Sequence, residues 1–257
     1  MINQIHHSYK VVSNDKLSAK FYNLRIDAKS ILKKIKPGQF VHLKVNDGLV
    51  PFFRRPFSIY RAQQYLEIFY EVVGPGTKIL SSKDKRDVID ILGPLGNAFT
   101  LPSKKITQVV MVAGGIGVAP FLALSDILKK QNIELILLYG GRTKEHVYPM
   151  KEFKQNGVKV FIATDDGSVG VKGRVSKLFT KINAQAEKTL MYTCGPKPMM
   201  KAVQEFAWKH NIQGQAACEE VMACGIGVCL GCAIKTTEGY KTVCHEGPVF
   251  DLQKVIF

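Results

Sequence analysis

The sequence predicts a mixed β and α/β protein, with an N-terminal antiparallel β-barrel (residues 1–100), a doubly wound parallel α/β domain (101–213) and a small C-terminal lobe (214–257). Three observations predict this division. They are hydrophobic alternation in the first part, unalternated apolar runs separated by helical patterns in the second, and closely spaced cysteines in the third. With 46% hydrophobic and 22% charged residues among 257, the chain has a globular composition and can bury a large core.

Alternating apolar side chains predict the strands of the barrel. Val41, Leu43 and Val45 share one face of an expected strand over Phe40–Val45, and Tyr65–Val73 repeats the period of two. Glycine or proline recurs about every ten residues, as in sheets of short strands joined by turns. This pattern is typical of a closed antiparallel barrel.

The pattern changes near residue 101. Val109–Val112 is an apolar run without alternation, typical of a strand buried on both faces. A glycine loop follows, and then a helix expected to begin at Pro120. Further strands are predicted over 134–139, 158–163 and 189–193, with helical stretches between or after them. Such alternation predicts a parallel sheet covered by helices on both faces.

The chain is basic, with 36 Lys and Arg against 21 Asp and Glu and a formal net charge of +15. The lysines form scattered pairs and no basic run interleaved with aromatics, so we expect a solvated basic surface and no nucleic-acid partner. The longest apolar stretch, 109–124, is broken by glycines and too short for a membrane span. The first residues lack the pattern of a secretory signal. We therefore expect a cytoplasmic protein without a membrane partner.

Four of the six cysteines have a spacing that points to a metal centre. They are Cys224, Cys229, Cys232 and Cys244. Three ligands on one loop and a fourth from a distant segment fit the plant-type pattern for a [2Fe–2S] cluster. Gly225, Gly227 and Gly231 allow the loop to turn its amides toward the sulfurs. A zinc site is the alternative, but zinc sites favour two separated pairs. The remaining Cys218 is expected to be a small buried residue.

Two segments of the expected barrel carry groups that suit a flavin nucleotide. In Arg54–Ser58, a guanidinium can bind phosphate, and an aromatic ring and a hydroxyl can flank a flavin ring. Gly74–Thr77, ahead of a helical stretch expected from Lys78, offers free amides to a pyrophosphate. The alternatives are a surface arginine pair and an ordinary helix cap.

Two strand–helix turns in the α/β domain are placed for a dinucleotide. The loop Gly114–Pro120 supplies Gly114, Gly115 and Gly117, although it lacks the G-x-G-x-x-G spacing. Cys194-Gly195-Pro196 follows a later strand in the same way. Dinucleotides bind beyond the carboxyl ends of parallel strands. The position of the two turns therefore favours dinucleotide binding only modestly over plain strand–helix turns.

Taken in order, these segments resemble the ferredoxin–NADP reductase superfamily and, within it, the electron-transfer subunits of class B dihydroorotate dehydrogenase. The resemblance extends from Pro37 to Phe250. The motifs that carry it are Arg54–Ser58, Gly93–Asn97, Gly114–Pro120, Cys194–Pro196 and Glu219–Gly227.

The resemblance implies sites for FAD, a [2Fe–2S] cluster and NAD. The family's FAD contacts fall on Arg55, Pro56, Phe57, Ser58, Phe69, Tyr70, Glu71, Gly76 and Thr77, and its cluster ligands on the four spaced cysteines. Two departures concern side chains. Tyrosine often stands where this chain has Phe57, and basic residues also occur at the position of Glu71, whose backbone alone is expected to make a contact.

The resemblance also implies an electron relay. A partner subunit holding FMN would oxidise dihydroorotate, and electrons would pass through the cluster and FAD to NAD⁺, in a heterotetramer of two copies of each subunit. Flavin can exchange both single electrons and hydride, so no acid–base catalytic residue is expected. The family implies NADH rather than NADPH, although Arg142 and Lys144 can pair with a 2′-phosphate.

Three alternatives remain at this point. One is the small subunit of a ferredoxin-dependent NAD(P)H transhydrogenase or sulfide dehydrogenase, in which one cluster ligand is typically aspartate. The others are a self-sufficient NADH-dependent reductase and a non-catalytic zinc-binding module.

Overall fold

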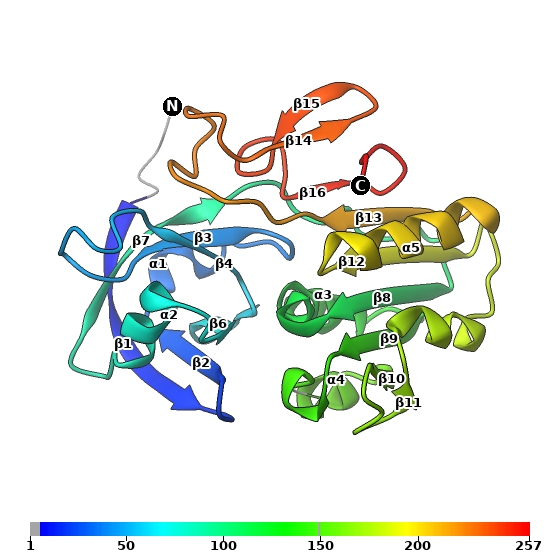
Figure 1. The fold of residues 1–257 in the computed structure, drawn as a ribbon, viewed down its shortest axis with the longest axis horizontal. Coiled ribbons are helices and arrows are strands. Elements are labelled where there is room, and N and C mark those ends of the chain that lie inside the picture. The colour runs from blue at the N-terminus through cyan, green and yellow to red at the C-terminus, as the bar shows by residue number, and fades with distance from the viewer. Residues whose placement is uncertain (1–5, 149) are drawn as a thin grey trace.

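Two seven-stranded sheets and a two-stranded hairpin form the computed structural model, which describes residues 6–148 and 150–257 (Figure 1). The first sheet is antiparallel throughout. In spatial order its strands are β4 (Arg55–Ser58), β3 (Phe40–Lys44), β7 (Val88–Leu95), β1 (His6–Lys16), β2 (Phe21–Ile26), β6 (Leu66–Glu71) and β5 (Arg61–Ala62).

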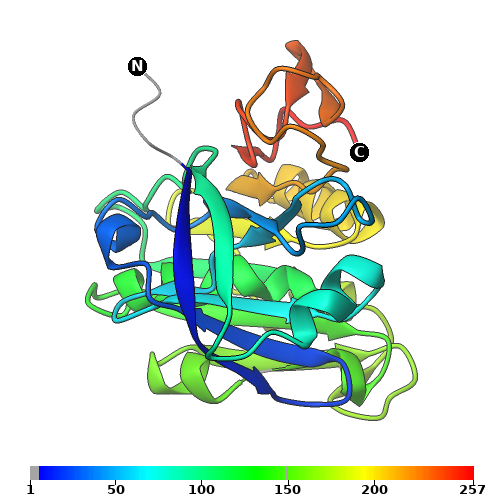
Figure 2. The same ribbon diagram turned by 90° about the vertical axis from the view of Figure 1, so that its left-hand side faces the viewer.

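The first sheet curls around its own core, as Figure 2 shows from the side. Val41 and Leu43 point into this core together with Ile68 and Ile91, as the alternation predicts. The end strands β4 and β5 are not hydrogen-bonded to each other, so the barrel is open and the prediction of a closed barrel is wrong. The helices beside it are α1 (Lys29–Leu32) and α2 (Pro75–Ser81). The helix α2 begins at Pro75 rather than Lys78, because proline is favoured in the first turn.

The second sheet has six parallel strands and one antiparallel edge strand. In spatial order these are β11 (Val171–Lys172), β10 (Lys159–Thr164), β9 (Glu134–Gly141), β8 (Gln108–Gly114), β12 (Thr189–Cys194), β13 (Gln213–Ala217) and β16 (Val249–Asp251). Its helical elements are η1 (Gly115–Val118), α3 (Ala119–Leu128), η2 (Lys144–His146), α4 (Lys151–Gln155), η3 (Val175–Lys181) and α5 (Lys197–Lys209).

Helices cover both faces of the parallel sheet, which confirms the doubly wound α/β prediction. Val109 and Met111 of β8 pack in one core with Phe121 of α3. Val110 and Val112, which alternate with them, belong to the opposite core, and so does Val203 of α5. The run without alternation is therefore buried on both sides.

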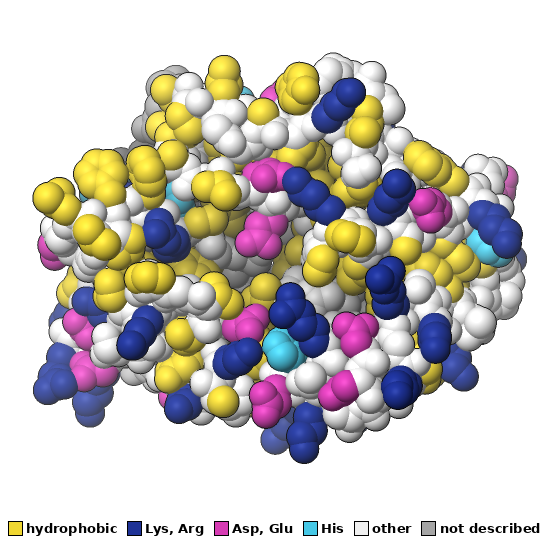
Figure 3. Space-filling view, in the orientation of Figure 1, with side chains coloured by type: hydrophobic (Ala, Val, Ile, Leu, Met, Phe, Trp, Pro, Cys, Tyr) yellow, Lys and Arg dark blue, Asp and Glu magenta, His cyan; other side chains and the backbone are white. Residues whose placement is uncertain are grey.

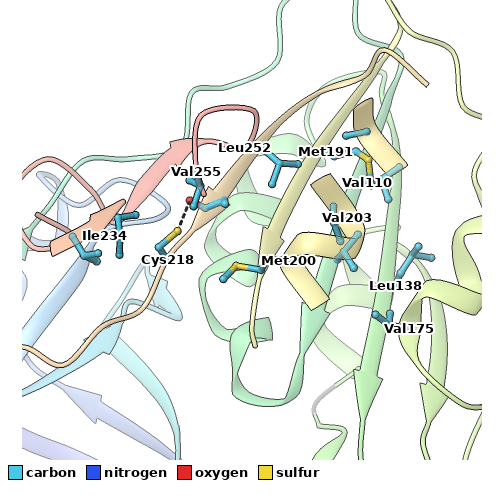
Figure 4. Close-up of a cluster of buried hydrophobic side chains, with 14 of the residues drawn as sticks. Val110, Leu138, Val175, Met191, Met200, Val203, Cys218, Ile234, Leu252 and Val255 are labelled. Carbon is cyan, nitrogen blue, oxygen red and sulfur yellow. Dashed lines mark hydrogen bonds between the residues drawn. The ribbon is translucent and has the colours of Figure 1, made fainter. Parts of the chain in front are cut away.

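The C-terminal lobe packs against both other parts of the molecule. It contains the hairpin β14 (Ala233–Thr236) and β15 (Gly239–Thr242), and its strand β16 extends the parallel sheet beside β13. Figure 4 shows one core that continues from α5 to Cys218 and Ile234. The side chain of Asn97 fixes the lobe to the barrel: its Nδ2 donates to the carbonyl of Val249 (2.7 Å) and its Oδ1 accepts from the Val249 amide (2.9 Å).

A partly buried ion pair joins the barrel to the α/β domain. Arg61 on β5 donates through Nε to a carboxylate oxygen of Asp126 on α3 at 2.7 Å. The predicted domain boundaries stay predictions. The strand β13 spans the boundary predicted between residues 213 and 214. No helix within 6–148 and 150–257 is long and apolar enough to cross a membrane.

Candidate functional site

A cleft of about 1130 Å³ lies between the barrel and the carboxyl edge of the parallel sheet. Figure 3 shows the hollow at the centre of the molecule. The predicted site residues that line it are Glu71, Gly114, Gly115, Gly117, Gly195 and Pro196. The cleft thus brings together the two predicted strand–helix turns and the end of β6.

The two turns touch backbone to backbone at the base of the cleft. A Cβ on Gly117 would lie 2.3 Å from the carbonyl oxygen of Cys194, and one on Gly195 would lie 2.9 Å from the amide nitrogen of Gly114. Gly195 also has a φ of +148°, which side chains rarely adopt. Cys194 itself is buried below the cleft, and this burial raises the pKa of its thiol. Glycine therefore keeps the two turns in contact and leaves their backbone exposed to a ligand.

Several cleft residues carry no local sequence signal. Arg174, Ser176 and Lys197 line the cleft beside Arg142, which the sequence had suggested as a phosphate contact. Arg174 and Ser176 lie at the start of η3 and Lys197 lies at the start of α5, and only the parallel sheet brings these two segments to one edge. Glu219 also lines the cleft. Its side chain is solvent-exposed, but partial desolvation by the surrounding atoms and the neighbouring Glu220 raise the pKa of its carboxyl.

On the barrel, Arg54, which precedes β4, and Arg55, the first residue of β4, have different partners. Arg54 pairs through Nη1 with Asp90 at 2.9 Å. Arg55 donates from Nη1 to the carbonyl of Phe53, at 2.7 Å, and forms no ion pair among the residues described. A Cβ on Gly76 of α2 would lie 3.0 Å from Nε of Arg55. The Arg55 side chain therefore lies directly against the first turn of α2, where backbone amides lack intrahelical partners.

The predicted flavin contacts differ in what they can offer. Thr77 uses its hydroxyl locally, accepting from the amides of Val73 (2.9 Å) and Gly74 (3.1 Å). The side chain of Phe69 is buried in the core that contains Phe121 of α3, and the side chain of Tyr70 is buried in the core of the barrel. Only backbone groups of these two residues are therefore available to a ligand. Both side chains are buried because β6 has packed side chains on both of its faces. Alternation of apolar and polar residues with a period of two does not indicate burial on both faces.

Ser58 and the preceding ring complete the predicted flavin strand. Pro56, Phe57 and Ser58 are all half-buried on β4, and the ring of Phe57 meets that of Tyr70 edge-on at 5.8 Å between centroids. This strand pairs with β3, from Leu43 opposite Arg55 to Phe40 opposite Ser58.

The four spaced cysteines come together at the outer face of the barrel. We call residues 219–232 the cysteine loop. Cys224 and Cys229 form one pair, in which the Cys229 amide donates to Sγ of Cys224 at 3.4 Å, and Cys232 and Cys244 form another, in which the Cys244 amide donates to Sγ of Cys232 at 3.3 Å. No group of three or more His, Cys, Asp and Glu side chains within the described ranges is arranged to hold a single metal ion. Two pairs of thiols suit a centre of two irons, each with two cysteine ligands.

Backbone amides point at these sulfurs. Sγ of Cys224 accepts from the amides of Ile226 (3.5 Å) and Cys229 (3.4 Å), and Sγ of Cys244 accepts from Gly227 (3.1 Å). The loop achieves this with positive φ angles at Gly225 (+72°) and Gly227 (+82°). Although partial burial acts in the opposite direction, these amide donors lower the pKa of the Cys224 thiol to about 6. The loop is thus prepared to hold thiolate, the form that binds iron.

Family models match the two parts of the chain that contain these sites. Residues 111–205 match the oxidoreductase NAD-binding domain. Residues 219–256, which contain all four spaced cysteines, match the iron–sulfur cluster binding domain of dihydroorotate dehydrogenase B. The prediction of an iron–sulfur lobe is therefore confirmed against the zinc alternative.

Relatives and solved structures resemble the chain over nearly its whole length. The electron transfer subunit of dihydroorotate dehydrogenase B (NAD(+)) from Caldanaerobacter subterraneus subsp. tengcongensis is 38% identical, with 96% of this chain and 97% of the relative covered. The subunit of the same name from Fusobacterium nucleatum is 36% identical, with 93% and 94% covered. The structure of an NADH-dependent reduced ferredoxin-NADP oxidoreductase aligns with a TM-score of 0.85 at 26% identity, over 100% of this chain and 91% of the other.

The curled antiparallel sheet, the nucleotide-binding sheet and the cysteine loop define an oxidoreductase of the ferredoxin–NADP reductase type with an iron–sulfur lobe. Within that class, the chain belongs to the family of electron-transfer subunits of dihydroorotate dehydrogenase B.

Proposed function

We propose that this chain carries electrons between a catalytic subunit that oxidises dihydroorotate and NAD⁺. The observation that carries the proposal is the position of the cysteine loop. It packs on the outer face of β3, the neighbour of the predicted flavin strand β4, while the glycine-lined cleft opens between the barrel and the parallel sheet. This order along the molecule supports three cofactor sites in series.

Each cofactor site is proposed from residues whose positions the structure describes. Cys224, Cys229, Cys232 and Cys244 hold a [2Fe–2S] cluster, with amide donors to their sulfurs already in place. Arg55 and the first turn of α2 bind the FAD pyrophosphate, because a cation and free amides meet there. When bound, FAD can exchange hydride with a nicotinamide and single electrons with the cluster.

The cleft binds NAD(H). The backbone of Gly114, Gly115 and Gly195 forms its base at the carboxyl edge of the sheet. Asp165, which follows β10, also lines the cleft, and a carboxylate there suits a ribose 2′-hydroxyl and opposes a 2′-phosphate. This supports NADH over NADPH, although Arg142 and Arg174 line the same cleft.

The partner is an FMN-containing catalytic subunit, and two copies of each chain form the complex. An apolar surface supports a docking site at the cysteine loop, where Val221 is 85% exposed, Val228 74% and Leu230 64%. Such exposure is unusual on a surface that contacts only water. We also place the protein in the cytoplasm, because cysteines that bind iron must stay reduced.

Reconstitution with the catalytic subunit tests the function. The isolated chain is expected to contain FAD and a [2Fe–2S] cluster, to reduce artificial dyes with NADH and to oxidise no dihydroorotate. Adding the catalytic subunit should restore NAD⁺-linked dihydroorotate oxidation. Dihydroorotate turnover by the isolated chain would contradict the relay.

Docking through the cysteine loop is tested by Val228→Glu. The added charge should reduce NAD⁺-linked dihydroorotate oxidation in the complex and leave NADH–dye activity unchanged. The control is Val171→Glu, an exposed valine on the edge strand β11. Unimpaired coupling in Val228→Glu would place the partner elsewhere.

A second candidate is the small subunit of a ferredoxin-dependent NAD(P)H transhydrogenase. The likeness to the NADH-dependent reduced ferredoxin-NADP oxidoreductase favours it. The four cysteine ligands favour the dihydroorotate enzyme, since one ligand is expected to be aspartate in the transhydrogenase subunits. Copurification with a dihydroorotate-oxidising flavoprotein separates the two.

A further inference from the structure

His42 lies between the barrel and the cysteine loop. It occupies the middle of β3, where Val41 and Leu43 point into the barrel core. Phe40, two residues before His42 and on the same side of the strand, packs in the core that contains Cys232 and Cys244. The His42 side chain therefore faces the iron–sulfur lobe, and Figure 1 shows the chain after β13 passing next to β3.

The His42 ring touches the cysteine loop directly. A Cβ on Gly225 would lie 2.5 Å from Nδ1 of His42 and 3.1 Å from its Cε1. Gly225 immediately follows the proposed ligand Cys224. The ring thus occupies the space where any other residue at 225 would place its side chain, next to the proposed cluster.

The imidazole is fully buried and has no polar partner in the protein. His42 has 0% relative exposure, and neither Nδ1 nor Nε2 forms a hydrogen bond with any residue the structure describes. Buried polar groups are nearly always hydrogen-bonded, so an unpartnered ring at this place requires an acceptor that the chain does not itself supply.

Burial keeps the ring neutral. It lowers the pKa of His42 to about 4, with the cations Arg54 and Arg55 contributing, although the backbone of Arg54, which lies near the ring without forming a hydrogen bond to it, opposes the shift. Asp90 is the nearby carboxylate, and it pairs with Arg54 and His6. A neutral imidazole carries one N–H donor, and a cluster adds sulfide and thiolate sulfurs that accept hydrogen bonds.

We propose that His42 is a positioning residue for the iron–sulfur centre: its ring N–H donates a hydrogen bond to a cluster sulfur and raises the reduction potential of the cluster. The inference rests on the proposed function, because it requires the [2Fe–2S] cluster. One electron enters the cluster on reduction and makes the sulfurs more negative, which strengthens the hydrogen bond, while the proton stays on the ring. Hydrogen bonds to sulfur are among the factors that set such potentials.

The position also links this residue to the flavin side of the relay. His42 pairs across the sheet with Pro56 of the flavin strand β4. The same short piece of β3 therefore contacts the cysteine loop through a side chain and the flavin strand through its backbone. A change at His42 is expected to act on the cluster first, since its ring faces the lobe.

A redox titration of the holoprotein, followed by the electron paramagnetic resonance signal of the reduced cluster, tests the inference. His42→Phe keeps a flat ring but has no N–H. At the wild-type midpoint potential, its ratio of reduced to oxidised cluster should fall about tenfold, which corresponds to about 59 mV for a one-electron couple. His42→Gln keeps an N–H donor and should recover more than half of that shift. The control is His210→Gln at the end of α5.

A second measurement detects the contact in the wild-type protein itself. In wild-type protein labelled with ¹⁵N-histidine, pulsed paramagnetic resonance of the reduced cluster should show a weak ¹⁵N coupling, which His42→Gln removes and His210→Gln retains. An unchanged midpoint in a fully loaded His42→Phe protein overturns the inference, and so does the absence of the ¹⁵N coupling. A wild-type protein without a [2Fe–2S] signal would instead overturn the proposed function.

Discussion

The cleft and the cysteine loop both depend on glycine, but they use it in opposite ways. At the cleft, glycines bring two turns of one domain together, with Gly117 against the carbonyl of Cys194. In the cysteine loop, Gly225 and Gly227 have positive φ and pack against the side chains of His42 and His245. The cleft is therefore formed within the α/β domain, whereas the cysteine loop takes its shape partly from the barrel.

Thiols that lie close together in the chain differ in pKa according to burial and amide donors. Cys218, just before the cysteine loop, is buried without amide donors to its sulfur among the contacts described, and burial raises its pKa to about 12. Cys224 accepts amide hydrogen bonds, which lower its pKa to about 6 despite partial burial. Cys244 accepts from the Gly227 amide, yet burial and the Cys232 thiol raise its pKa to about 12. The amide donors of the loop therefore favour thiolate at Cys224 first.

Removing a ligand should produce the largest effect. Cys229→Ser is expected to abolish the cluster and all NAD⁺-linked dihydroorotate oxidation in the complex, because a hydroxyl is a poor iron ligand in place of thiolate. FAD content and NADH–dye activity should remain, because Cys229 is exposed and does not line the cleft. Iron, acid-labile sulfide and flavin analyses check this. Loss of FAD together with iron would show that the two regions are not independent.

Arg55→Ala should weaken FAD binding by about 1.5–3 kcal/mol, the contribution of a charge-assisted hydrogen bond. Equilibrium titration of the apoprotein with FAD measures this. Arg54→Ala is the matched control: its guanidinium pairs with Asp90, so the variant should lose stability rather than FAD affinity. An unchanged FAD affinity in Arg55→Ala would mean that Arg55 is a surface residue without a contact to FAD.

Gly117→Ala tests the contact between the two turns of the cleft. The added methyl meets the Cys194 carbonyl, so we expect a loss of about 1–3 kcal/mol in stability and a higher KM for NADH. Thermal unfolding and steady-state kinetics check both effects. Gly48→Ala serves as the control, because the nearest atom to its added Cβ is 3.8 Å away. Wild-type behaviour in Gly117→Ala would mean that the turns can separate without consequence.

Cofactor preference is the smallest expected effect. The kcat/KM should be higher for NADH than for NADPH, and Asp165→Ala should lower the value for NADH roughly tenfold by removing a hydrogen bond of about 1.5 kcal/mol. Steady-state kinetics with both cofactors measures this. A higher value for NADPH would assign the cleft cations Arg142 and Arg174 to a 2′-phosphate instead.

The sequence predicted what depends on local patterns. The unalternated run at Val109–Val112 lies within β8, and the spacing of the cysteines indicated the iron–sulfur lobe. Proline in the first turn places the start of α2 earlier than the hydrophobic pattern suggested. The barrel is open because closure depends on pairing between the end strands, which alternation within each strand does not report.

Residues whose surroundings depend on tertiary contacts could not be assigned a role from the sequence patterns. Alternation along β3 marked Val41 and Leu43 as the buried face, which left His42 on the face expected to meet solvent. That face is covered by a segment from the other end of the chain. Likewise, Arg174 and Lys197 reach the cleft only through the order of strands in the parallel sheet.

The antiparallel pairing of β16 with β13 has a consequence for the fate of the protein when iron is scarce. Ala216 and Ala217 pair with Phe250 and Val249, so the lobe covers what would otherwise be the free edge of the parallel sheet. Exposed strand edges are templates for aggregation. A lobe that loosens without its cluster would uncover this edge, so iron starvation would act on the solubility of the subunit as well as on electron flow.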